Sequence, residues 1–142
     1  MKFKEKGIFI NCKDEPFIEL IMEHRKRVET RTKDVFKGLF DGKDSEFVFL
    51  IETGNGVPTI RGEVRIERGC FVDADVFDKC MRSLACIDKD SKYNSDKGKW
   101  CYPIRWAYKT RTFQLPKNAV RHGRSWCEFE VSYDEMYDKY SD

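Results

Sequence analysis

The stretch KRVETR at residues 26–31 is the most informative part of the chain, because charged and uncharged side chains alternate along it. Successive side chains of a β-strand point to opposite faces, so the alternation predicts a strand with Arg27, Glu29 and Arg31 on one face. A carboxylate between two guanidinium groups forms a natural ion network. Two interpretations stay open: part of a binding or catalytic site, or a structural network that only neutralises itself.

An amphipathic helix is predicted immediately before this strand. A helix start near Pro16 is followed by Phe17, Leu20, Ile21 and His24 at the spacing of one helical face. His24 closes this apolar face, which favours a packing role over a catalytic one.

The remaining pattern is mainly that of strands. A continuous apolar run at residues 47–51 predicts a strand buried on both faces, and Gly54-Asn55-Gly56 predicts the turn after it. Residues 1–142 are expected to form a single domain with an acidic tail at about 132–142. Further strands are predicted at residues 8–11, 60–67, 102–113 and 125–131, a second helix at 73–87, a loop or short helix at 33–43 and a loop at 88–99.

A basic segment runs from Lys97 to Arg124, with eight Lys or Arg residues and no Asp or Glu. Alternation along its strand places Arg105, Lys109 and Arg111 on one face. An acid-free stretch of this kind is what a polyanion selects, although the solvated outer face of a strand has the same appearance. Since the whole chain has 27 basic and 25 acidic residues, the excess is local and offset by the acidic tail.

Aromatic residues are interspersed with these cations. The same alternation predicts that Trp106 and Tyr108 face the core, whereas Trp100, where the loop meets the strand, is predicted to be the exposed ring. Trp100 is therefore the expected stacking platform for a base.

Cysteine and histidine placement argues against a metal site, so no metal or cofactor is expected. The six cysteines form no Cys-x-x-Cys pair and have no histidine at ligand spacing. We expect reduced thiols, mostly in the core, with Cys101 as the one to test for reactivity because its neighbourhood is basic. The apolar run Ile8 to Ile10 is too short for an export signal or a membrane span, so a cytoplasmic protein without a membrane partner is expected.

The order of elements, with Lys26, Glu29 and Arg31 directly after the first helix and a later Leu-Pro through Gly123-Arg124-Ser125-Trp126, resembles the ASCH domain of the PUA-like superfamily. The resemblance covers roughly residues 8–131. It implies an α+β fold: a PUA-like mixed β-barrel of about six strands with two flanking helices. It also implies a cleft beside the motif strand.

The functions implied by this resemblance differ in class. The first is a nucleic-acid-binding module, for RNA or a nucleotide and with DNA possible, that uses the basic cleft. The second is a small hydrolase acting on a modified nucleoside or on RNA, with Lys26 and Glu29 as catalytic residues. A third, argued from charge alone, is a protein-interaction module that docks its acidic tail on a basic partner.

Two departures from the family pattern bear on this choice. His24 stands where the family usually has Gly, and Glu29 stands where the amidohydrolase type has Thr.

The site expected from these arguments joins the motif strand and the basic segment in one cleft, with His122 as a proton donor if its loop folds over the cleft. The residues predicted to bind nucleic acid are Lys26, Arg27, Arg31, Trp100, Arg105, Lys109, Arg111, Lys117, Arg121, His122 and Arg124.

Overall fold

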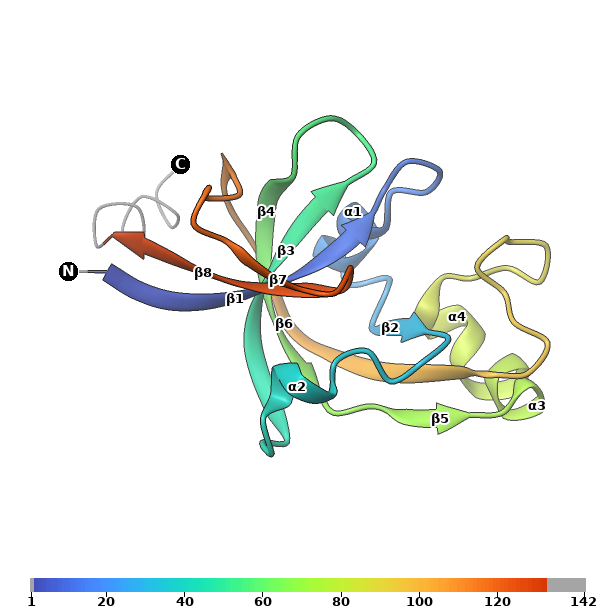
Figure 1. The fold of residues 1–142 in the computed structure, drawn as a ribbon. Helices are drawn as coiled ribbons and strands as arrows, with labels where there is room; N and C mark the ends of the chain where they lie inside the picture. Colours follow the sequence, from blue (N-terminus) through green and yellow to red (C-terminus); the bar gives the residue numbers. More distant parts are fainter. Residues whose placement is uncertain (1, 133–142) are drawn as a thin grey trace.

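Strands dominate the protein, whose structure, a computed structural model, describes residues 2–132 (Figure 1). It is an α+β fold. The strands are β1 Lys2–Asn11, β2 Val28–Arg31, β3 Ser45–Thr53, β4 Thr59–Glu67, β5 Cys70–Val72, β6 Lys99–Gln114, β7 Val120–His122 and β8 Trp126–Ser132. The helices are α1 Phe17–Met22, α2 Lys37–Phe40, α3 Ala74–Val76 and α4 Arg82–Ala85, with a π-helical turn η1 at Phe77–Met81. The predicted acidic tail, beyond residue 132, lies outside the described residues.

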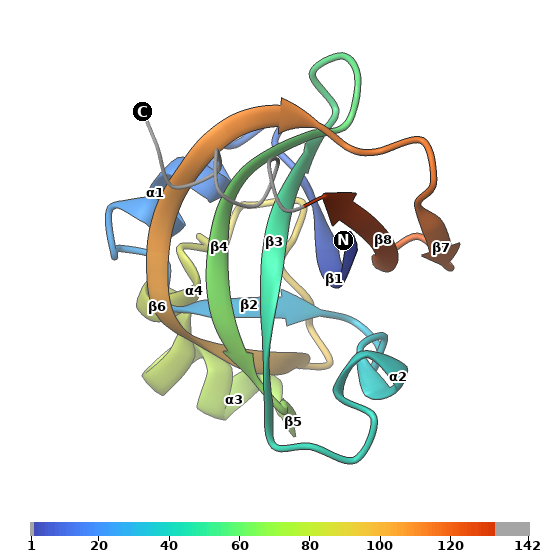
Figure 2. The same ribbon diagram turned by 90° about the vertical axis from the view of Figure 1, so that its left-hand side faces the viewer.

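The strands form one sheet of eight in the order β2-β6-β4-β3-β1-β8-β7, with β5 paired to β6. β1 and β3 run parallel, and the other pairs are antiparallel. The sheet curves strongly (Figure 2), and β2 and β7 are the two ends of its hydrogen-bonded order. About six strands were predicted. The two additional ones, β5 and β7, have three residues each, too few for alternation to mark them.

Alternate residues of β3 enter two different apolar clusters. Val48 and Leu50 pack in the cluster that includes α1 and α2 side chains, whereas Phe49 and Ile51 pack in the cluster that includes Phe129 of β8. The predicted burial of both faces is therefore confirmed for residues 48–51. Phe47 is exposed and extends beyond this core.

The pairing of β4 with β6 has two irregularities, and the first along β6 reverses the side-chain faces of this strand. In the first, two residues of β6, Trp106 and Ala107, lie opposite the single residue Val64 of β4. Trp106 has φ 53°, the left-handed conformation found at the first residue of some bulges, where Gly is usual. The prediction that Trp106 faces the core is wrong, because the bulge turns the ring outward and leaves 68% of the residue exposed.

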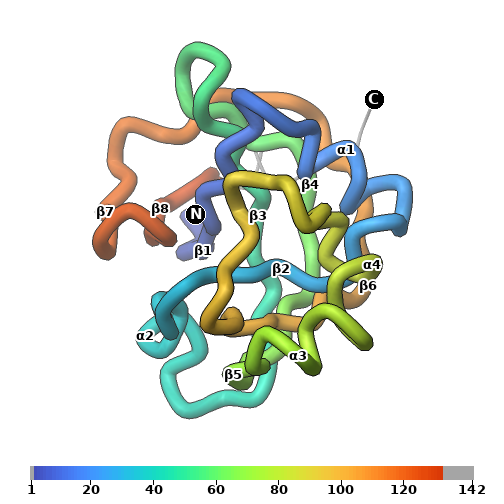
Figure 3. Tube along the Cα trace, turned by 90° about the vertical axis from the view of Figure 1, so that its right-hand side faces the viewer, coloured from blue at the N-terminus to red at the C-terminus, as the bar shows by residue number. Residues whose placement is uncertain are grey.

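The predicted second helix is present over residues 74–85 but is divided by the π-helical turn. After α4, residues 86–98 cross one side of the molecule before β6 begins (Figure 3). Within the described residues, no helix is long and apolar enough to cross a membrane.

All six cysteines are free thiols, but their environments differ from the prediction. Cys101 and Cys127 are buried, whereas Cys70 and Cys80 are exposed. Burial raises the pKa of Cys101 to about 11, so little thiolate exists at neutral pH. In Cys101, the thiol that the sequence singled out for a reactivity test, desolvation of the sulfur outweighs the basic neighbourhood.

Candidate functional site

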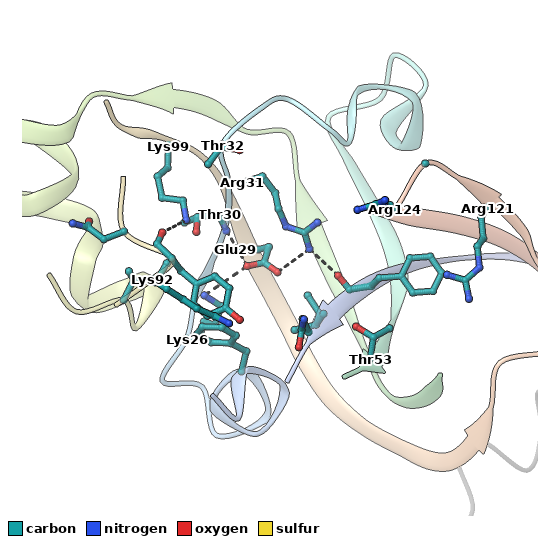
Figure 4. A pocket seen from close by; sticks show the side chains of 18 residues that line it. Lys26, Glu29, Thr30, Arg31, Thr32, Thr53, Lys92, Lys99, Arg121 and Arg124 are labelled. Carbon is teal, nitrogen blue, oxygen red and sulfur yellow. Dashed lines mark hydrogen bonds and ion pairs between the residues drawn. The ribbon is translucent and has the colours of Figure 1, made fainter. Parts of the chain in front are cut away.

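A cleft of about 660 Å³ lies beside β2, and residues from distant parts of the chain line it (Figure 4). β1 and β2 contribute neighbouring segments of its wall, residues 92–94 contribute the crossing loop, and residues 121–124 contribute the β7–β8 turn. Six cations and one carboxylate are among the lining residues: Lys26, Arg31, Lys92, Lys99, Arg121, Arg124 and Glu29.

Lys26 lies at the base of this arrangement and is only 1% exposed. Its Nζ donates to the Ala85 carbonyl at 2.6 Å, which satisfies one of the carbonyls left unpaired at the end of α4. The same Nζ lies 3.6 Å from Glu29 Oε1 and 4.5 Å from the centre of the Phe17 ring. Burial lowers the pKa of Lys26, and the neighbouring Glu29 charge offsets this only in part.

Glu29 is buried and has several partners within β2 and beside it. Its Oε1 accepts from the Thr30 backbone N–H at 2.9 Å, and its Oε2 accepts from Arg31 Nη2 at 3.2 Å. Burial raises the pKa of the carboxyl, but the charges of Lys26 and Arg31 and these hydrogen bonds outweigh it, so the net shift is downward. Glu29 is therefore ionised at neutral pH.

Arg31 connects two strands that are far apart in the sheet. β2 and β1 are separated by β6, β4 and β3, yet Arg31 Nη2 donates to the Phe9 carbonyl of β1 at 2.8 Å. The guanidinium also lies 4.8 Å from the centre of the Phe36 ring. The curvature of the sheet thus brings β2 opposite β1, and the cleft lies where they meet.

The other cations surround this buried group. Lys99 is 4% exposed, and its Nζ donates to the Tyr93 carbonyl at 2.6 Å. Burial lowers its pKa to about 8, so a fraction of Lys99 is uncharged at neutral pH. Arg121 lies with its guanidinium carbon 4.5 Å from the centre of the Phe9 ring, and Lys92 pairs with Asp14 outside the cleft.

The structure brings together Lys26, Glu29, Arg31, Arg121 and Arg124 from the predicted site. The other predicted residues do not line this cleft: Arg27, Trp100, Arg105, Lys109, Arg111, Lys117 and His122.

Arg27 is outside the cleft because β2 begins one residue after it. Its Nε donates instead to the His24 carbonyl at 3.0 Å, and the side chain is exposed. The predicted alternation therefore fails at its start, and Lys26 takes the buried position. His24 is also exposed, so the prediction that it packs on the helical face is wrong.

Residues of the basic segment diverge because the long β6 leads away from the cleft. Arg105 pairs with Glu67 at 2.6 Å on the exposed side of the strand. Trp100 packs edge-on against Phe71 with 6.4 Å between ring centres, and His122 stacks on Trp126 at 4.1 Å. The predicted single cleft shared by β2 and all of β6 is wrong; only Lys99, at the start of β6, reaches it.

Lys99, Lys92 and Tyr93 are among the lining residues that sequence reasoning missed. Lys99 falls in the acid-free segment, which was the available signal, but nothing distinguished it from its neighbours. Lys92 and Tyr93 belong to a polar segment that has the composition of a mobile surface loop, and only the folded chain places it against β1 and β2.

A solved structure of an ASCH protein from Zymomonas mobilis is similar over 94% of this chain and 92% of that chain, with TM-score 0.61 and 14% sequence identity. A serine-to-alanine mutant of ASCH from the same organism covers the same shares, with TM-score 0.65 and 13% identity. The chain has the ASCH-type fold. At the level of sequence, no model of a known protein family and no curated protein matches it.

Within this ASCH-type fold, the departure at His24 has a structural explanation. His24 has φ 61°, a conformation that glycine adopts without strain and other residues rarely adopt. The chain leaves α1 through this residue and enters β2. His24 therefore holds, at some cost in local strain, a backbone conformation that glycine would adopt without strain.

Proposed function

We propose that the cleft binds a nucleotide or one nucleotide of a single-stranded RNA. One observation carries the proposal: six cations line the cleft, and the only lining carboxylate among the described residues, Glu29, is already paired with two of them. The remaining positive charge favours an anionic ligand, and phosphate is the anion that Arg and Lys bind most often in nucleic-acid sites.

The rest of the lining suits a base as well as a phosphate. The rings of Phe9, Phe17 and Tyr93 provide apolar surface, and Thr30 and Asn94 are among the residues that provide polar groups. A volume of about 660 Å³ lies within the range of about 300–1,000 Å³ that is typical of small-molecule sites. A nucleotide has a charged phosphate, an aromatic base and polar base edges, which match the cations, the rings and the polar groups of this lining.

The test is the salt dependence of binding to a single-stranded RNA of about 12 nucleotides. We expect Arg121→Ala/Arg124→Ala to lower the salt slope by about 1.4, at roughly 0.7 for each phosphate that is no longer neutralised. Lys109→Ala/Arg111→Ala removes the same charge outside the cleft and is the matched control. Equal flattening by both variants, or no RNA or nucleotide binding by the wild type, contradicts the proposal.

A hydrolase is the second candidate, and one observation favours it. Lys26 and Glu29 lie side by side in the cleft, and burial shifts the pKa of Lys26 downward, as in many catalytic sites. The partners that both residues already have favour a structural role instead. The test is to incubate the wild-type protein with RNA and with acetylated cytidine and to analyse the products. Cleavage by the wild type that is lost in Lys26→Met supports the hydrolase.

A further inference from the structure

A second, smaller hollow of about 210 Å³ shares Lys26 with the cleft and opens elsewhere on the surface. His24 and Arg27 line it on one side, and Arg105 and Trp106 line it on the other. The backbone holds the two sides together, because the Arg27 carbonyl accepts from the Ile104 N–H at 2.8 Å. We call this hollow the Trp106 groove.

Backbone strain occurs on both sides of the Trp106 groove. His24 and Trp106 have φ values of 61° and 53°, and they are two of the four non-glycine residues with positive φ among the described residues. A bulky residue in this conformation is unusual, and such strain persists where a surrounding structure or a function maintains it. Here its effect is to turn a tryptophan ring out of the core and into the rim of the groove.

The exposed ring has an aromatic and cationic neighbourhood. The Phe47 ring lies 6.2 Å from it, centre to centre, and the Arg65 guanidinium carbon lies 6.0 Å from its centre. The lining has no Asp or Glu among the described residues. Glu67 pairs with Arg105 nearby, whereas no described carboxylate is within ion-pair distance of Arg27.

We propose that the Trp106 groove is a second contact site for single-stranded nucleic acid, in which a base stacks on Trp106 and flanking phosphates contact Arg27 and Arg105. Exposed aromatic faces beside cations are the usual platform for unpaired bases. The proposal rests on the proposed function, because the same strand would also place a nucleotide in the cleft. Lys26 forms part of the wall of both hollows, so the two proposed contact sites lie on either side of one residue.

The size of the groove supports a part of a longer ligand rather than a free small molecule. About 210 Å³ is below the range of about 300–1,000 Å³ for small-molecule sites, so the groove suits a single flat group held by its neighbours. A free nucleotide is therefore expected to prefer the cleft, and only an oligonucleotide is expected to use both sites.

The experiment compares a single-stranded RNA of about 12 nucleotides with a free nucleoside monophosphate. We expect Trp106→Ala to weaken binding of the RNA about tenfold and to leave binding of the monophosphate unchanged. Trp106→Phe keeps a ring and is expected to retain most of the affinity. Arg27→Ala is expected to lower the salt slope for the RNA by about 0.7, whereas Arg25→Ala, which removes a nearby exposed charge outside the groove, is not. Melting temperatures verify that each variant is folded.

The outcomes separate this inference from the proposed function. Unchanged RNA affinity in Trp106→Ala, with weakened affinity in Arg121→Ala/Arg124→Ala, overturns the groove and keeps the cleft. The reverse pattern keeps the groove and overturns the cleft. If the groove binds an acidic protein partner instead, the RNA affinity of Trp106→Ala is unchanged. A wild type that does not bind the RNA overturns both the groove and the cleft proposals.

Discussion

The cations of the cleft and those on the exposed side of β6 have similar chemistry and opposite environments. Lys26 and Lys99 are buried and donate to backbone carbonyls, whereas Arg105 and Lys109 are exposed. A buried ammonium destabilises a fold unless it has partners, and an exposed one costs almost nothing. The fold therefore fixes the positions of the buried cleft cations through specific partners, whereas a dense run of surface charge in the sequence implies no such constraint.

The largest expected effect is on stability, at Glu29. We expect Glu29→Gln to lower the free energy of unfolding by about 3 kcal/mol, because the buried charge of Lys26 and the half-buried charge of Arg31 lose their counter-ion. The matched surface variant Glu67→Gln, which breaks the pair with Arg105, is expected to cost less than about 1 kcal/mol. Chemical denaturation measures both. Equal costs contradict the contrast between buried and exposed pairs.

The pH dependence of this difference follows from the lowered pKa of Glu29. A carboxyl with a depressed pKa in the folded state adds stability above its unfolded pKa of about 4.3 and loses it as the pH falls through the lower folded value. The gap between wild type and Glu29→Gln should therefore persist at neutral pH and close only in acid.

A smaller effect is expected on ligand affinity at Lys99. Its pKa of about 8 means that the ammonium loses its proton as the pH rises through that value, so an anion in the cleft binds more weakly in alkaline solution. We expect a several-fold loss of RNA affinity between about pH 7 and pH 9, and a flatter profile in Lys99→Arg, because a guanidinium stays protonated. Lys109→Arg, on the exposed side of β6, serves as control and should keep the wild-type profile. A profile that Lys99→Arg does not change would remove Lys99 from the site.

The smallest effect is expected at Trp106. Glycine adopts positive φ without the cost of about 1–2 kcal/mol that other residues incur, although it loses more chain entropy on folding. We expect Trp106→Gly to raise the free energy of unfolding by about 0.5 kcal/mol, despite removing a large ring. Trp126→Gly, at a buried position, should lower it by more than about 3 kcal/mol. A large loss of stability in Trp106→Gly would mean that the ring serves packing.

The sequence predicts the parts of this fold that depend on regular periodicity. The strand at KRVETR, the apolar strand before Gly54 and the helical segment after Asp73 are in the predicted places. Alternation fails where the backbone departs from it: the start of β2 puts Lys26 in the cleft in place of Arg27, and the bulge in β6 turns Trp106 outward.

Five of the seven charged residues that line the cleft were accessible to the same reasoning. Glu29 and Arg31 follow from the motif strand, and Arg121 and Arg124 follow from the basic segment. Lys92 and Tyr93 do not, because their position depends on how residues 86–98 cross the fold, and no local pattern specifies that path.

The position of β1 has a consequence for how the chain is made. β1 lies between β3 and β8, and its pairing with β8 joins residues 2–8 to residues 126–132. A chain emerging from the ribosome therefore has one edge of β1 unpaired until nearly all of the described residues have been synthesised. Unpaired edges promote aggregation, and lysines on such an edge oppose it. Lys2, Lys4 and Lys6 lie along this edge. β1, whose partner β8 is synthesised last, therefore carries lysines that oppose aggregation before the pairing forms.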